Sequence, residues 1–124
     1  MYRTSDERIE LLEKEIRRQA FQIQLLHAII QNKEKAGIYD LVLQMKISEP
    51  TFLSLKRLTK KYEDQLNDGF SITLSSFIQH VQTVFERNGD IIHFNDLSHF
   101  IPRWLGGTNG NEGFSTRLHE HFYS

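Results

Sequence analysis

Four basic side chains are the residues whose type and spacing best suit a chemical role, because they share one face of a predicted helix. They are Lys56, Arg57, Lys60 and Lys61, directly after the stretch MKISEPTFLSL. Residues 38–62 fit the spacing of a helix-turn-helix, whose second helix offers such side chains to DNA phosphates. The positions that must be apolar to pack the two helices hold Leu41, Met45, Ile47, Phe52 and Leu55.

Other residues of the same segment argue against DNA reading. Val42 stands where close helix contact normally needs a small residue, and Lys46 stands where a positive φ normally needs glycine. At the start of the second helix, Glu49, Pro50 and Thr51 lack the Arg, Asn or Gln side chains that read base edges. We interpret the segment as an ordinary helical corner with a solvated basic face, and keep a DNA-binding regulator as the alternative.

Six histidines suggest metal binding, but their spacing gives it no support. His119 and His121 would lie roughly 200° apart around a helix, so one ion could not bind both without unwinding it. The other candidate histidines are His93 and His99, and the candidate carboxylates for an acid–base pair are Asp90, Asp96, Glu112 and Glu120. Nothing in the spacing holds any two of them together, so we predict no metal, no cofactor and no enzymatic activity.

Residues 106–113, GGTNGNEG, are rich in glycine but lack the spacing and the Lys-Ser/Thr pair of a phosphate-binding loop. We predict a flexible connection there. Trp104 lies just before this segment, beside Pro102 and Leu105. We expect its ring in the core or in a subunit interface rather than in a ligand site.

The composition is that of a globular protein without a preference for nucleic acid or membrane. Fifteen basic and sixteen acidic residues among 124 give a net charge of -1. Cysteine is absent, which excludes disulfides and thiolate chemistry. The longest apolar run, residues 25–30, is far below the roughly 20 residues that cross a bilayer. Five of the first ten residues are charged, where a secretory signal would be apolar. We predict one cytoplasmic domain over residues 1–124, with no membrane contact.

Residues 1–35 are predicted to form an oligomerising helix with a heptad repeat. The repeat runs through Ile9, Leu12, Ile16, Gln19, Ile23 and Leu26. Isoleucine at the a positions and leucine at the d positions favour parallel two-stranded coiled coils, and a polar residue such as Gln19 often sets register. We predict a dimer, with a trimer as the second choice. The alternative is a single amphipathic helix packed on its own domain, and Phe21, Leu25 and Ile29 indicate that the second half does pack there.

A helical core is predicted over residues 36–88. Gly37 is expected to end the first helix in the left-handed conformation, and Ser48 is expected to cap the helix that carries the basic residues. A turn at residues 67–69 precedes a helix capped by Ser71 or Thr73, and Asn88-Gly89 ends that helix.

Residues 89–124 are predicted to be an irregular helical segment. Residues 91–94 read as extended, and Pro102 is expected to kink or end a short helix capped by Asn95 or Asp96. A short closing helix carries Phe114, Leu118 and Phe122. The predicted fold class is therefore all-α, with a long N-terminal coiled-coil-like helix and three to five shorter helices.

Three stretches resemble a small family of helical proteins from Bacillus-like bacteria, the YhaI-like family. They are residues 8–13, RIELLE; the corner from YDLV at residues 39–42 to Ile47-Ser48; and residues 68–70, DGF. The likeness covers residues 6–88 and includes no catalytic motif. It implies a cytoplasmic all-helical protein with associating N-terminal helices and no assigned activity.

These patterns together predict a non-enzymatic, homo-oligomeric interaction or regulatory module that meets a protein partner. The predicted oligomer interface is the heptad repeat of the first helix. The competing hypothesis is a DNA-binding transcriptional regulator that uses residues 38–62, with the same helix setting its dimer.

Overall fold

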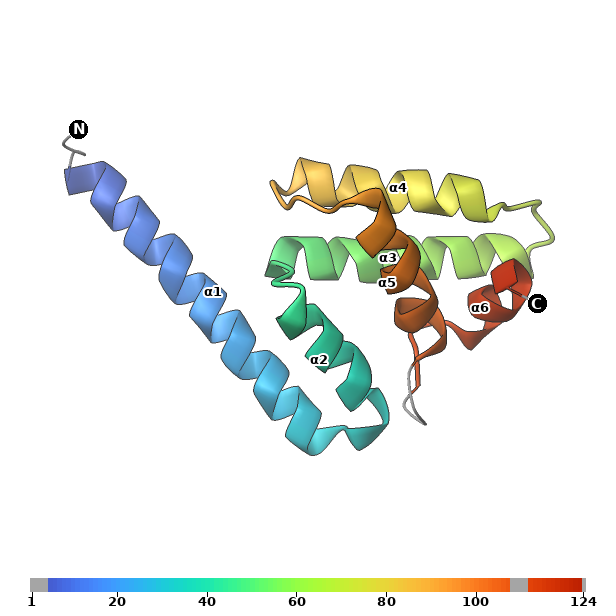
Figure 1. Cartoon of the computed structure of the whole chain (residues 1–124), viewed down its shortest axis with the longest axis horizontal. Coiled ribbons are helices and arrows are strands. Elements are labelled where there is room, and N and C mark those ends of the chain that lie inside the picture. The colour runs from blue at the N-terminus through green and yellow to red at the C-terminus, as the bar shows by residue number, and fades with distance from the viewer. Residues whose placement is uncertain (1–4, 108–111, 124) are drawn as a thin grey trace.

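The computed structural model describes residues 5–107 and 112–123, and every regular element in these ranges is helical. Figure 1 shows a long first helix beside a bundle of shorter ones. The elements are α1 (Ser5–Gln31), the 3-10 turn η1 (Lys33–Lys35), α2 (Ala36–Gln44), α3 (Glu49–Asn67), α4 (Leu74–Arg87), α5 (Phe94–Gly106) and α6 (Thr116–Tyr123). The predicted all-α class, with a long first helix and up to five shorter ones, is confirmed.

The helix α1 folds back onto α2 through η1, so that the two form an antiparallel pair. Figure 1 shows the N-terminal half of α1 projecting away from the other helices. Phe21 and Leu25 are the buried residues of α1, and both lie in its second half. The Phe21 ring reaches α3, where its centroid lies 5.6 Å from that of Phe52.

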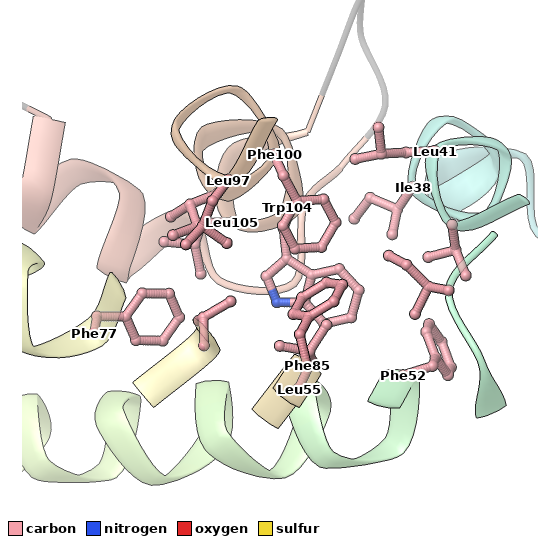
Figure 2. Close-up of a cluster of buried hydrophobic side chains, with 14 of the residues drawn as sticks. Ile38, Leu41, Phe52, Leu55, Phe77, Phe85, Leu97, Phe100, Trp104 and Leu105 are labelled. Carbon is pink, nitrogen blue, oxygen red and sulfur yellow. The ribbon is translucent and has the colours of Figure 1, made fainter. Parts of the chain in front are cut away.

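The remaining helices enclose an aromatic core. In Figure 1, α3 and α4 run side by side and α5 crosses them, with α6 at their far end. Trp104 of α5 lies at the centre of the cluster drawn in Figure 2, and its side chain is only 1% exposed. Its ring contacts those of Phe52, Phe100 and Phe114. The expectation that Trp104 belongs to the core rather than to a ligand site is therefore confirmed.

The turns on either side of α4 and its N-cap are formed by the residues that the sequence predicts. Gly69 and Gly89 adopt φ values of +84° and +76°, which glycine reaches without strain. Thr73 caps α4, because its hydroxyl accepts a hydrogen bond of 3.1 Å from the Ser76 amide. These features confirm the predicted turns, and of the two candidate caps, Ser71 and Thr73, it is Thr73 that caps α4.

Three predicted helix boundaries are wrong. The first helix ends at Gln31, and Gly37 lies inside α2, where Ile38, Leu41 and Val42 are buried and hold the helix together. Likewise α5 starts at Phe94 with His93 as its cap, ahead of the predicted caps Asn95 and Asp96, and Pro102 does not end the helix. Leu97, Phe100, Ile101, Trp104 and Leu105 are all buried, and their packing outweighs the roughly 3 kcal/mol that an internal proline costs a helix.

The chain that follows the glycine-rich segment packs closely against the end of α5. Residues 108–111 lie outside the described residues, but the chain beyond them pairs with the end of α5. The Phe114 amide donates to the Trp104 carbonyl at 2.8 Å, and the Ser115 amide donates to the Leu105 carbonyl at 3.0 Å. Gly113 approaches so closely that an added Cβ would lie 2.0 Å from the Leu105 carbonyl oxygen.

We therefore predict that Gly113→Ala lowers the free energy of unfolding by about 2–3 kcal/mol, because the backbone must shift to relieve the overlap. Gly89→Ala is the matched control, since no atom lies within 4 Å of an added Cβ there and only the positive φ is strained. Its cost should be about 1 kcal/mol. Urea denaturation of both variants tests this, and equal losses would contradict the close approach at Gly113.

Candidate functional site: the exposed face of the first helix

The six residues of the predicted oligomer interface lie along the exposed side of α1; we call them the seam. Its five apolar side chains are 52–64% exposed, and Gln19 is exposed as well. The seam consists of Ile9, Leu12, Ile16, Gln19, Ile23 and Leu26. Large apolar side chains this exposed are common singly on a monomer, whereas several of them in one row are more typical of an interaction surface.

A different face of α1 holds the helix to its own domain. Phe21 and Leu25 are buried there, and Ile29 is half-buried, as the widening of the apolar stripe predicts. Ile23 and Leu26 lie on the opposite side of the same turns and stay exposed. The second half of α1 therefore has two apolar faces, of which the chain itself covers one.

The first half of α1 has no such anchor. Among residues 5–20, no side chain is buried. Local contacts support this half: Arg18 donates to Glu15 at 2.6 Å, and the Gln19 amide donates to the same carboxylate at 3.2 Å. The hydrogen bond from Arg18 lowers the pKa of Glu15, so the carboxylate is charged at neutral pH. Isolated helices of such length are marginal in water, and most helical stability in proteins comes from packing of an apolar face.

The corner between α2 and α3 has the backbone of a tight helical turn. The Lys46 amide donates to the Leu43 carbonyl and the Ile47 amide to the Val42 carbonyl, each at 3.1 Å. Lys46 takes a φ of +54°, the conformation for which glycine was expected. Lysine at this position is therefore no obstacle to the turn, although it carries the strain of a left-handed residue.

The start of α3 is held by a carboxylate from a distant segment. Ser48 is the N-cap residue, as predicted, but its hydroxyl donates to Asp90 Oδ2 at 2.7 Å instead of accepting from the helix. The Thr51 hydroxyl, fully buried, also donates to Asp90 Oδ2. A negative charge here interacts favourably with the helix dipole. The same charge and the burial of Thr51 disfavour the approach of DNA to the end of α3 that would read bases.

The four predicted phosphate contacts do lie together, on the exposed side of α3; we call them the basic face. Two of them have partners in the chain. Lys60 donates to Asp64 at 3.0 Å, which raises the pKa of Lys60, and the Lys56 ammonium lies 5.5 Å from the Phe52 ring centroid. A shallow open hollow joins this face to Asp64 and Asp68. The surface is therefore of mixed charge.

Two of the titratable residues singled out in the sequence, Asp96 and His99, line one hollow beside α5. A hollow of about 430 Å³ between α2 and α5 is lined by Asp96, His99 and Arg103 together with apolar side chains such as Leu41 and Ile92. In the described part of the chain, no three His, Asp or Glu side chains lie close enough to hold a metal ion. His121 instead lies 3.1 Å from the Ile72 carbonyl oxygen.

The fold and the seam define a class: all-helical proteins whose long first helix presents an apolar face that its own domain leaves uncovered. The chain is 33% identical over 121 residues to a protein of Bacillus subtilis (strain 168) named "Uncharacterized protein YqxJ", and the match covers 98% of each chain. The chain therefore belongs to the YqxJ family, which confirms the expected kinship with proteins of Bacillus-like bacteria.

No protein-family model matches the chain, and no solved structure matches it. None of the described helices is both long and apolar enough to traverse a bilayer.

Asp90 accepts the hydrogen bonds at the start of α3 that the sequence did not reveal. Replacing Asp90 should lower stability by a measurable amount. We expect Asp90→Ala to lower the free energy of unfolding by about 2 kcal/mol, because it leaves the buried Thr51 hydroxyl without its acceptor. Asp90→Asn, which keeps an oxygen acceptor, should cost less. Asp68→Ala, at an exposed residue, should change stability by less than about 0.5 kcal/mol in the same urea titration.

The basic face gives a prediction that separates the two functional hypotheses. Replacing Lys56, Arg57, Lys60 and Lys61 by glutamine should leave the circular dichroism and the mass in light scattering unchanged, since all four are exposed. Fluorescence anisotropy with random duplex DNA should show no binding by either protein at about 50 or 200 mM salt. Binding that weakens by powers of ten between these conditions and is lost in the variant would support DNA contact instead.

Proposed function

We propose that this chain is a non-enzymatic interaction module that self-associates through the seam of α1, most simply as a dimer, and presents its helical bundle to a protein partner. One observation carries the proposal. An apolar row, interrupted at Gln19, is exposed on α1 from Ile9 to Ile30, including the half that projects from the domain. Covering such a row with an identical row from a second copy is the simplest symmetric solution.

The chemistry of the seam supports a coiled coil over other modes of packing. Isoleucine occupies positions 9, 16, 23 and 30, and leucine occupies positions 12 and 26, a pattern that repeats every seven residues. Ile30, which extends the row, is 73% exposed. Three apolar layers on each side of Gln19 could therefore pair between two chains.

The competing use of the chain as a DNA-binding regulator has less support. Its requirements would be a free end of α3 and a basic face with unpaired charges. Asp90 occupies that end, and Asp64 binds Lys60. A catalytic role likewise finds little support, because Asp90, one of the carboxylates considered for it, is engaged with Ser48 and Thr51.

We also propose that the protein works in the cytoplasm, which the absence of cysteine supports. The YhaI-like proteins are proposed as members of the same wider group. The shared RIELLE stretch at residues 8–13, which includes the first two residues of the seam, supports that grouping.

The proposal predicts that Ile16→Asp combined with Ile23→Asp yields monomers, because the paired seam would bury four like charges at its centre. Light scattering after gel filtration measures the mass directly. The matched control is Arg17→Asp with Gln24→Asp, one residue further along and on exposed positions outside the seam. The control should keep the mass of the unaltered chain. A monomeric unaltered chain, or a double seam variant of unchanged mass, would contradict the proposal.

A further inference from the structure

Two charged residues flank the first apolar layers of the seam. Arg8 precedes Ile9 and Glu13 follows Leu12, and both side chains are exposed on α1. In the part of the chain that the structure describes, the ion pairs involve other residues, so neither Arg8 nor Glu13 has an ion-pair partner. In heptad terms they occupy positions g and e, the positions that form salt bridges between the helices of a coiled coil.

The direction in which two copies pair decides whether these charges meet. When the helices are parallel and in register, Arg8 of each copy lies beside Glu13 of the other, which gives two symmetric ion pairs. An antiparallel pairing that matches Ile9 with Leu26 would place Arg8 near Ile29 and Glu13 near Ala20. It offers only Asp6 beside His27, a pair with opposite charges solely when the histidine is protonated.

The polar layer of the seam favours the same direction. In a parallel, in-register pair Gln19 faces Gln19 of the second copy, so that the two amides can bond to each other. In the antiparallel pairing each Gln19 faces Ile16 of the other chain, and its amide would be buried against an apolar side chain. A buried amide without a partner is costly, so the polar layer penalises that arrangement.

We infer that two copies of this chain associate through α1 in parallel and in register, held in that direction by Arg8–Glu13 ion pairs and the Gln19 layer. The inference rests on the proposed function of the seam. It places the two bundles at the same end of the paired helices, on their outer sides, because Phe21 and Leu25 attach each bundle to the face opposite the seam. The Ser5 ends lie together at the other end.

A charge exchange tests the ion pairs. Arg8→Glu alone and Glu13→Arg alone each replace two attractions by two repulsions, and each should weaken the dimer about tenfold at low salt in sedimentation equilibrium. The variant that combines both changes restores opposite charges at each pair. Its dissociation constant should return to within about twofold of that of the unaltered chain. A combined variant as weak as the single ones would overturn the inference.

Disulfide trapping tests the direction independently, because the unaltered chain has no cysteine. Under mild oxidation Leu12→Cys should link to itself, since parallel pairing brings residue 12 of both copies together. A mixture of Ile9→Cys and Leu26→Cys chains should give no linked heterodimer.

The outcomes separate this inference from the function on which it rests. A dimer that links residue 9 to residue 26, and not residue 12 to itself, overturns the parallel arrangement and leaves the seam as the interface. A chain that stays monomeric at tens of micromolar in light scattering overturns both.

Discussion

The burial of the Trp104 indole is the interaction on which the rest of the structure depends. Its N–H donates to the Thr59 hydroxyl at 2.9 Å, and that hydroxyl donates to the Leu55 carbonyl at 2.7 Å. The polar edge of the largest side chain in the core is therefore satisfied, which removes the main cost of burying it. With the indole of α5 fixed against α3, the rings of Phe52 and Phe114 pack against it and against each other.

This aromatic contact extends to the first helix and fixes how α1 faces solvent. Phe52 contacts Trp104 on one side and Phe21 on the other, so the position of Phe21 is set by the core. A helix held at Phe21 and Leu25 must turn Ile23 and Leu26 outward, because at 3.6 residues per turn they lie roughly 200° and 140° around the helix from Phe21. The exposure of the seam is thus a consequence of core packing, and α1 does not need a separate device to present it.

Much of this was predictable from the sequence, because it rests on local periodicity. The heptad of α1, the buried second face at Phe21 and Leu25, the cap at Thr73 and the turns at Gly69 and Gly89 all come from spacings of a few residues. Lys46 is a case in which the residue type misled the prediction. Two backbone hydrogen bonds close the turn around it, and they impose a positive φ on a residue whose type argues against that conformation.

The features that sequence reasoning missed depend on residues far apart in the chain. Asp90 holds the start of α3 across 42 positions, and the partner of Trp104 lies 45 positions away. Gly37 and Pro102 have helix-breaking types, yet burial of their neighbours keeps both inside helices. Gly113 reads as part of a loop until the closeness of the Leu105 carbonyl is known. None of these partners could be assigned from spacing, because tertiary packing brings them together.

Gln19 is placed both by the local heptad repeat and by the tertiary packing of α1. It lies where the projecting half of α1 meets the half anchored by Phe21, with three apolar layers on either side. An isoleucine or leucine there would strengthen association through the seam. It would also remove the energetic penalty on other registers and on antiparallel pairing. In the proposed dimer Gln19 therefore lowers the stability of the interface somewhat but defines one register and one direction of pairing. It does so at the last turn before the domain, where an error in direction would carry the bundles to opposite ends.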